Sequence, residues 1–125
     1  MVVTHVTMGS NPIPRPKKEV AMRIMLKSKI HGIKVTDVNA EYHGSISIDA
    51  KLLKKVDIME YEQVHVLDVT NGARFETYAI KGAKGECCVN GAAARLVNFD
   101  DVLIVLAYGL YDSVARYHKP KILEL

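Results

Sequence analysis

An Asn71-Gly72 dipeptide between two β-rich runs is the feature that most restricts what this chain can fold into. Asn-Gly flanked by alternating apolar residues is the strongest short-range signal for a β-hairpin, because both residues tolerate the positive φ angles of the turn. The runs are residues 63–70 and 74–80, and each alternates with the period of a half-buried strand. Two antiparallel strands are therefore predicted at the centre of the chain.

The two strands of this hairpin assign faces to several side chains. Val64, Val66 and Val69 are expected to face the core, whereas Asp68 is expected to be more exposed. Arg74 and Tyr78 share one face of the second strand and stand ~13 Å apart, at ~3.3 Å per residue. Two long side chains at that spacing can reach opposite ends of one small ligand, although an exposed hairpin face is more commonly just a solvated surface.

The remainder of the chain repeats this pattern of short strands and turns. Lys29–Val35 predicts a strand with a bulge or bend at Gly32, and Asp49 is a plausible N-cap for a short helix. Residues 37–41 are polar and predict a loop, while the composition of residues 102–108 predicts a fully buried strand. About six short strands with two or three helical turns predict a mainly β fold, a small closed β-barrel.

Length and charge limit the number of domains and the class of partner. The chain has 125 residues, which suits one domain, and its net charge is +3. Arg15, Lys17 and Lys18 lie in residues 1–21, a segment rich in turn formers that is predicted to be a disordered or non-native leader. Residues 22–125 then carry 14 basic and 13 acidic side chains, a near-neutral balance that argues against a nucleic-acid partner.

Apolar runs and cysteines point to a reducing, soluble compartment. The apolar run at residues 102–108 is far shorter than the ~20 residues of a membrane helix, and no targeting signal is visible. Cys87 and Cys88 are adjacent, so a disulfide between them would be severely strained, and one such pair is not a zinc motif. We expect a cytoplasmic protein that has no membrane partner and no metal site.

The usual catalytic constellations are missing from the sequence. It has no phosphate-binding glycine loop and no nucleophile elbow, and its histidines are scattered. What remains is a set of isolated polar residues on predicted strands and turns: Lys29, Tyr42, Ser45, Arg74, Thr77, Tyr78 and Asn90. Composition and periodicity leave these residues unconnected.

Four blocks of sequence connect them. Residues 25–31, 42–49, 70–78 and 89–97 resemble, in order and spacing, the family of bacterial pyruvoyl-dependent aspartate 1-decarboxylases, which make β-alanine for pantothenate synthesis. The resemblance implies a six-stranded double-psi β-barrel with short helices. It also implies a homotetramer with active sites between subunits and L-aspartate as the small-molecule substrate.

The resemblance further implies that the proenzyme cuts itself between Gly44 and Ser45 into a β chain and an α chain. Ser45 would attack the carbonyl of Gly44, with the hydroxyl of Thr77 in support, and Gly44 suits the step because it allows close approach and unusual φ and ψ angles. Elimination and hydrolysis would convert Ser45 into a covalent pyruvoyl group, used in place of a metal or pyridoxal phosphate. A maturation factor is a possible partner.

The same resemblance assigns the residues of turnover. The ketone derived from Ser45 would form a Schiff base with the substrate amine, and Tyr78 would be the proton donor. The substrate-binding residues implied are Arg74, Lys29, Asn90, Gly91, Ala92 and Ala93, with His31 and Tyr42 as further positions near the site. Leu67 departs from the larger aromatic residue that many members of the family carry.

Two alternatives stay open on sequence alone. Small basic barrels with swapped hairpins bind DNA and regulate transcription, although the near-neutral residues 22–125 argue against that function. A pyruvoyl decarboxylase of another small amino acid is the second alternative. Two cationic side chains, Arg74 and Lys29, favour a substrate with two carboxylates.

Overall fold

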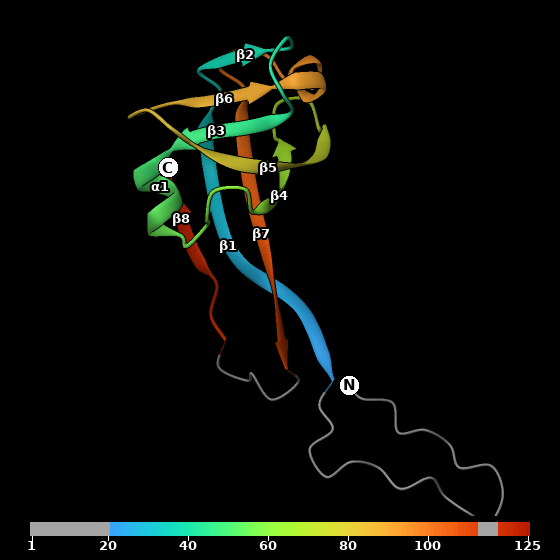
Figure 1. Cartoon of the computed structure of the whole chain (residues 1–125), viewed down its shortest axis with the longest axis vertical. Coiled ribbons are helices and arrows are strands. Elements are labelled where there is room, and N and C mark those ends of the chain that lie inside the picture. Colours follow the sequence, from blue (N-terminus) through green and yellow to red (C-terminus); the bar gives the residue numbers. More distant parts are fainter. Residues whose placement is uncertain (1–20, 113–117) are drawn as a thin grey trace, which may run out of the picture.

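The computed structural model describes residues 21–112 and 118–125, so the predicted leader, at residues 1–20, lies outside the described residues. Figure 1 shows the elements. In chain order they are β1 (Met22–Lys34), β2 (Asp37–Asn39), β3 (Ser45–Asp49), α1 (Ala50–Lys55), β4 (Gln63–Asp68), β5 (Arg74–Gly82), β6 (Cys87–Asn90), the 3-10 helix η1 (Gly91–Leu96), β7 (Val102–Asp112) and β8 (Lys121–Glu124).

The strands form one sheet in the order β2-β6-β3-β5-β4-β7-β1-β8, which confirms the predicted mainly β fold. Six of the strands, β1 and β3 to β7, contribute buried apolar side chains to a single core, whereas β2 and β8 are short and mostly exposed. Among the fully buried members of this core are Ile30, Ile46, Ile48, Val64, Val66, Ala79, Val89, Leu103 and Val105. The predicted six-stranded barrel corresponds to these six core-lining strands.

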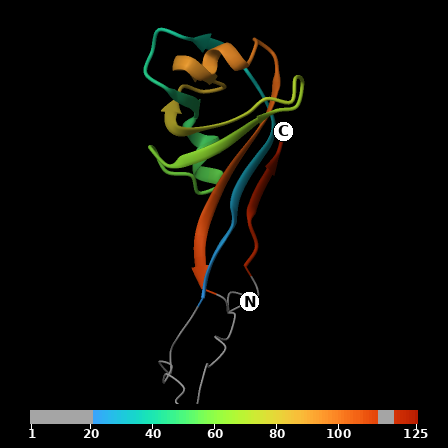
Figure 2. The ribbon, with the colours of Figure 1, turned by 90° about the vertical axis from the view of Figure 1, so that its right-hand side faces the viewer.

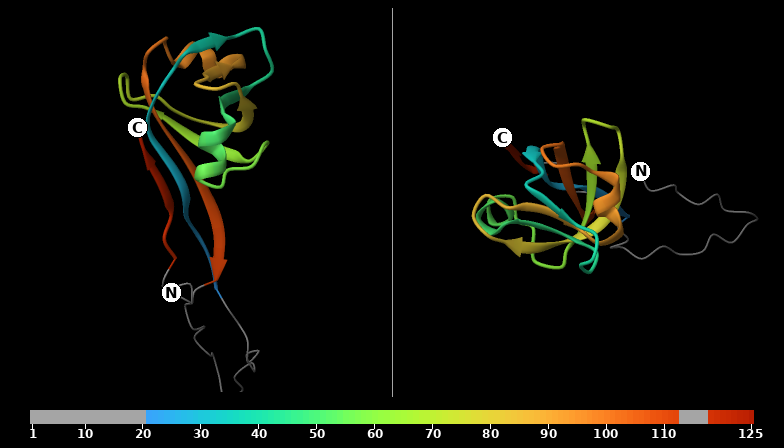
Figure 3. Two further views of the ribbon diagram at one scale, coloured as in Figure 1. Left: turned by 90° about the vertical axis from the view of Figure 1, so that its left-hand side faces the viewer. Right: turned by 90° about the horizontal axis from the view of Figure 1, so that it is seen from above.

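The chain segment between β1 and β2 closes the barrel. The Thr36 backbone N–H donates to the Cys87 carbonyl oxygen at 2.8 Å, and the Cys87 N–H donates to Thr36 Oγ1 at 2.8 Å. Since β2 stands at one end of the sheet order and β1 near the other, this crossing joins the two ends. Viewed from above, the strands curl around a shared interior (Figure 3).

β1 and β7 form a long antiparallel pair that extends away from the barrel, with β8 beside β1 (Figure 2). The register of this pair shifts between His31 and Ile33, so the bulge predicted at Gly32 is confirmed. Gly32 has φ +94°, and a Cβ there would lie 2.8 Å from the Leu125 carbonyl oxygen. Glycine is needed at this bend because the C-terminal residue packs directly on it.

Local predictions from turn and cap residues hold. β4 and β5 are antiparallel, with Leu67 opposite Arg74, and Gly72 in the turn between them has φ +80°. Asp49 caps α1, because its carboxylate accepts a hydrogen bond from the Lys51 N–H at 2.8 Å. Backbone bonds from Gly85 and Lys51 lower the pKa of Asp49.

Four burial and strand predictions are wrong. Val69, predicted to face the core, is 58% exposed just after the end of β4. Residues 37–39 form β2 instead of a loop, because they pair in parallel with β6 while staying exposed to water on an edge. Asp68 is buried, since its carboxylate closes the hairpin turn by accepting from the Thr70 and Asn71 N–H groups. β7 is not fully buried: Val105 faces the core, whereas its neighbours in the strand face outward and are half-exposed.

Candidate active site

A buried polar cluster marks the start of β3. The Asn90 Nδ2 group donates to Ser45 Oγ at 2.9 Å and to Ser47 Oγ at 3.1 Å, and the Cys88 thiol donates to Asn90 Oδ1 at 3.2 Å. The antiparallel register of β3 and β6 produces this cluster, because Ser45 stands opposite Asn90 and Ser47 opposite Cys88. Ser45 is only 1% exposed and Asn90 4%. A nucleophilic hydroxyl is thus held in a dry site by an amide donor.

The peptide segment before Ser45 packs on the first residue of η1. Gly91 has φ +72°, and a Cβ at that position would lie 2.6 Å from Gly44 Cα and 2.8 Å from Gly44 N. Gly44 itself has no left-handed φ, and a Cβ on it would meet nothing within 4 Å. The close approach that sequence reasoning attributed to Gly44 is therefore made possible by Gly91.

The hydroxyl of Ser45 lies close to the exposed segment that precedes β3. Its contact with the His43 carbonyl oxygen is 3.5 Å, the outer limit of a hydrogen bond. Tyr42 is half-exposed, with its ring edge against the His43 ring. On the other side of the cluster, Ala92 is exposed and Ala93 half-buried in η1. The structure thus brings together Gly44, Ser45, Asn90 and Gly91.

The predicted cationic residues lie elsewhere, on the outward face of the sheet formed by β1, β7, β4 and β5. One cross-strand row of opposed residues consists of His31, Ile104, Leu67 and Arg74. The next row on the same face consists of Lys29, Leu106, His65 and Glu76. All eight side chains are half-buried or exposed. Tertiary pairing therefore places Lys29, His31 and Arg74 on one surface.

One of these three cationic side chains has an acidic partner, and the other two have none in residues 21–112 and 118–125. His31 Nδ1 lies 2.8 Å from Glu124 Oε2 of β8. Within the described part of the chain, the side chains of Lys29 and Arg74 form no hydrogen bond or ion pair. Arg74 also borders a small cavity of about 180 Å³ with His65 and Glu76. Among the described residues, Lys29 and Arg74 are thus the two predicted cations of this face whose side chains have no acidic partner.

Thr77 and Tyr78 face opposite sides of β5, as the alternation predicts. Thr77 stands opposite the buried Val64, and Tyr78 opposite the exposed Gln63. β3 and β5 are parallel, and Ile46 pairs with Ala79. The preceding residues of the two strands, Ser45 and Tyr78, therefore occupy the same level of the sheet. Side chains at the same level of a parallel pair point to the same face. Tyr78 is therefore oriented toward the face that carries Ser45.

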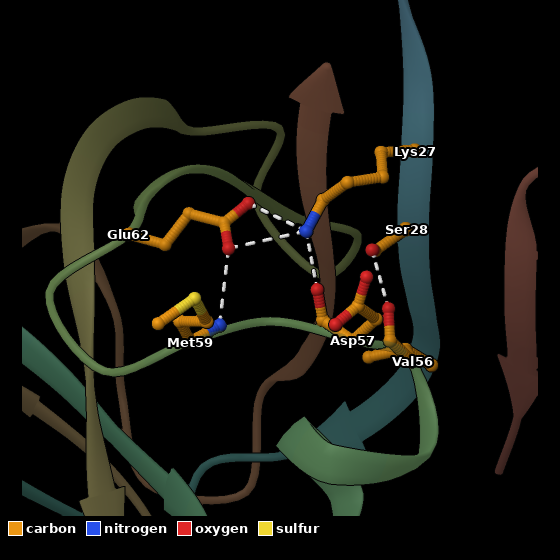
Figure 4. A network of polar contacts seen from close by, with 6 residues as sticks. All are labelled: Lys27, Ser28, Val56, Asp57, Met59 and Glu62. Atoms are coloured by element: carbon orange, nitrogen blue, oxygen red, sulfur yellow. Dashed lines mark hydrogen bonds and ion pairs between the residues drawn. The ribbon is translucent and has the colours of Figure 1, made fainter.

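A second network, which sequence reasoning missed, holds the loop between α1 and β4, residues 56–62 (Figure 4). Lys27 Nζ of β1 bonds the carboxylate oxygens of Glu62 at 2.8 and 3.1 Å and also the Asp57 carbonyl oxygen. One of the same Glu62 oxygens accepts from the Met59 N–H at 3.0 Å. The loop contains two residues with left-handed φ angles, Asp57 at 61° and Tyr61 at 72°. These bonds hold it in a conformation that is unfavourable for side chains with a Cβ.

The loop meets β5 next to Tyr78. The Tyr61 N–H donates to the Ala79 carbonyl oxygen at 2.7 Å, and the Ala79 N–H donates to the Glu62 carbonyl oxygen at 3.0 Å. The Tyr61 ring lies against the Tyr78 ring, with centroids 6.2 Å apart. No sequence motif signals the contact, because Lys27 and Glu62 are 35 residues apart in the chain.

The carboxyl groups of Asp68 and Asp101 interact at the far end of the β4–β5 hairpin. Burial, followed by a hydrogen bond with Asp101, raises the pKa of Asp68, and the same hydrogen bond lowers the pKa of Asp101. Asp101 also accepts from the Asn98 N–H at 2.9 Å. The pair joins the hairpin turn that leads into Arg74 to the loop that follows η1.

The cysteines are protonated. Burial raises the pKa of the Cys87 thiol to about 12, and burial together with the negative charges of Asp37 and Glu86 raises that of Cys88. In residues 21–112 and 118–125, no group of three or more His, Cys, Asp or Glu side chains is arranged to hold a metal ion. None of the described helices is long and apolar enough to cross a membrane.

These features define a small β-barrel with a buried, amide-bonded serine at a strand start and unpaired cations on an outward sheet face. The family model described as aspartate decarboxylase matches residues 21–125. The chain therefore belongs to the aspartate decarboxylase family.

Relatives agree with this assignment. The chain is 49% identical over 104 residues to an aspartate 1-decarboxylase of Thermoanaerobacter pseudethanolicus, covering 81% of this chain and 89% of the relative. It is 50% identical over 102 residues to that of Campylobacter hominis, covering 81% and 90%. The enzyme of Desulfitobacterium hafniense is 51% identical over 104 residues, covering 81% and 82%.

Proposed function

We propose that this chain decarboxylates L-aspartate to β-alanine and CO2, and that it first cuts itself between Gly44 and Ser45 to make its reactive carbonyl. Family membership and its relatives' names support the reaction. The observation that carries the self-cleavage is the Ser45 cluster. A buried hydroxyl bonded by Asn90 stands directly after a peptide that packs on Gly91.

Cleavage begins when Ser45 Oγ adds to the carbonyl carbon of Gly44. The C–N bond between Gly44 and Ser45 then breaks, and the hydroxyl proton passes to the freed nitrogen, leaving an ester. Elimination releases the Gly44 carboxylate and gives a dehydroalanine, and water then replaces the nitrogen as ammonia to give a ketone. The Asn90 Nδ2 donor stabilises negative charge that develops on Ser45 Oγ. The family resemblance assigns Thr77 to support this step, and Thr77 would do so from the face of β5 opposite to the one that Tyr78 and Ser45 share.

The residues around Ser45 fit a pyruvoyl group. A ketone oxygen accepts hydrogen bonds and donates none, and Asn90 Nδ2 already presents a donor to the side-chain oxygen of Ser45. When present, the group supplies an electrophilic carbonyl that binds the substrate amine and accepts the electrons released as CO2 departs. Asn90 and the Gly91–Ala93 backbone are the residues that would hold it and the bound substrate.

The outward face supplies the remaining roles. Arg74 binds a substrate carboxylate through its planar guanidinium, and Lys29 adds a second positive charge. Tyr78 delivers a proton to the substrate α-carbon once CO2 has left. His31 and Tyr42 line the approach to the site. Aspartate has two carboxylates, which fits two unpaired cations better than a neutral amino acid does.

The outward face also bears on how the chain assembles. The rows that carry Lys29 and Arg74 also contain half-exposed apolar side chains of Leu67, Ile104 and Leu106. Such a surface suits contact with another subunit, and a homotetramer with sites between subunits is our proposal for the working form. A cytoplasmic location and a maturation factor remain predictions.

Intact-mass analysis of purified protein tests the proposal. We expect two fragments, residues 1–44 and a Ser45-derived piece with a blocked amino terminus, and β-alanine formed from aspartate. A single uncut chain after prolonged warming, with or without a cell extract, would contradict it. Salt-sensitive binding of DNA in a gel-shift assay would instead favour a DNA-binding barrel. Faster turnover of another small amino acid would reassign the substrate.

A further inference from the structure

Cys88 and Ser47 are the members of the Ser45 cluster to which neither the cleavage nor the turnover assigns a role, and of the two only Cys88 contacts the oxygen of the Asn90 amide. Its side chain is on the same face of β6 as Asn90, two residues away, and it is 7% exposed. The thiol contacts Asn90 Oδ1 at 3.2 Å. Cys87, the adjacent residue, faces the opposite side and packs in the apolar core.

The contact matters because a side-chain amide has two orientations of similar shape and opposite polarity. In the observed orientation, Nδ2 donates to both Ser45 Oγ and Ser47 Oγ, and Oδ1 faces the thiol. After a half-turn of the amide, Oδ1 would face the two hydroxyls and accept their protons. Only the first orientation presents a donor to the Ser45 oxygen, and only that orientation offers the Cys88 S–H an oxygen acceptor.

We propose that Cys88 is a positioning residue for self-cleavage: its S–H donates to Asn90 Oδ1 and thereby keeps the Asn90 amide aimed at Ser45. This inference rests on the proposed function of Ser45. The thiol can serve as a permanent donor because its raised pKa keeps it protonated at neutral pH. Ser45 and Ser47 do not determine the orientation, since a hydroxyl both donates and accepts.

The test compares five variants of the full chain: Cys88→Ala, Cys88→Ser, Cys87→Ala, Asn90→Ala, and Cys88→Ala combined with Asn90→Ala. Cys87→Ala is the matched control, because it removes the same atom from a buried position one residue away that has no contact with Asn90. Cleavage is followed by intact mass over time, and unfolding by thermal melting. The Asn90 side-chain amide is followed by NMR in Ser45→Ala backgrounds, where no cleavage takes place.

We expect Cys88→Ala to slow cleavage roughly fivefold, the size of effect given by loss of one neutral hydrogen bond. Cys88→Ser, which keeps a donor, should restore the rate to within about twofold of the parent, whereas Cys87→Ala should lower the melting temperature without slowing cleavage. Cys88→Ala should add no further slowing once Asn90 is alanine, because it acts through that residue. The Asn90 amide signals should shift in the Cys88→Ala background and stay in place in the Cys87→Ala background.

The inference would be overturned if Cys87→Ala slowed cleavage as much as Cys88→Ala does. It would also be overturned if Cys88→Ala slowed cleavage about fivefold in a chain that already carries Asn90→Ala. Unmoved Asn90 amide signals would overturn it as well. The NMR measurement also separates the two proposals. A parent chain that never cleaves would contradict the proposed function, whereas the Asn90 signals would still decide whether Cys88 orients the amide.

Discussion

The polar groups of the Ser45 cluster and those of the outward face differ in how completely they are partnered. In the cluster, the side-chain polar atoms of Ser45, Asn90 and Cys88 bond to one another in the dry interior. On the outward face, Lys29 and Arg74 have no partner within the described part of the chain. The hydrogen bonds of the cluster are satisfied within the chain. The side chains of Lys29 and Arg74 have no such partner among the described residues, and we propose that an anion or another subunit supplies it. We therefore expect cleavage to depend on the cluster and turnover to depend on both regions.

Ser45→Ala gives the largest expected effect, because it removes the attacking oxygen. Neither fragments nor β-alanine should form, as measured by intact mass and by chromatography of the product. Ser47→Ala is the matched control, since Ser47 also accepts from Asn90 but does not adjoin the cut peptide. It should still be cleaved. Product formation by Ser45→Ala would end the proposed mechanism.

Tyr78→Phe should affect turnover without affecting cleavage, and so distinguish the role of the outward face from that of the Ser45 cluster. The variant keeps the ring and its contact with Tyr61, so cleavage should proceed as in the parent. Turnover should fall about 100-fold or more, because a general acid contributes on that scale. Steady-state kinetics of β-alanine formation measures it, with Tyr61→Phe as the control. Turnover like that of the parent would mean that another group supplies the proton.

Gly91→Ala should disturb the cluster from the backbone side. Its left-handed φ alone costs about 1–2 kcal/mol for a residue with a Cβ. The clash with Gly44 adds about 1–3 kcal/mol and displaces the peptide that is cut. Gly85→Ala is the control, with φ +77° and open space around it, so it should cost only the first amount and leave cleavage intact. Urea unfolding and intact mass measure the two effects.

Lys27→Met should loosen the loop against Tyr78 while leaving the Ser45 cluster alone. Glu62 would lose its cation in a half-buried site, and we expect the free energy of unfolding to fall by about 1–2 kcal/mol. Turnover should fall with little change in cleavage rate. The exposed Lys54→Met is the control. If the cleavage rate fell more than turnover, the loop would belong to the Ser45 region instead.

The Asp68–Asp101 pair gives the smallest expected effect, a slope of stability with pH. The raised pKa of Asp68 means that its contribution is present at low pH and is lost as pH rises through that pKa. Asp68→Asn mimics the protonated carboxyl and cannot titrate. Relative to the parent, the variant should therefore gain stability as pH rises above the ordinary value of 3.8. Urea unfolding from pH 4 to 8 checks the trend, and parallel curves for the parent and the variant would rule out a raised pKa of Asp68.

Some of the site was within reach of sequence reasoning. Alternation along β5 predicted that Thr77 and Tyr78 face opposite sides, and the register confirms it. Alternation along β6 likewise puts Cys88 on the same face as Asn90, so the sequence carries a signal for this contact. The Lys27–Glu62 contact had no such signal, because residues 35 positions apart meet only through the folded chain. The exposure predicted for Asp68 is wrong because its carboxylate accepts from the nearby Thr70 and Asn71 N–H groups and lies beside Asp101, which belongs to a loop that is distant in the sequence.

The sequence by itself determined the local structure. Asn71-Gly72 specifies a hairpin, Asp49 caps α1, and Gly32 permits the bulge in β1, because each acts through backbone angles or hydrogen bonds within a few residues. Only the tertiary structure decided that Asn90 points its amide at Ser45 and that Gly91 supports Gly44. It also placed Lys29 and Arg74, from β1 and β5, on one face. Strand pairing across the barrel brings these groups together, and its register depends on packing of the whole core rather than on any one stretch of sequence.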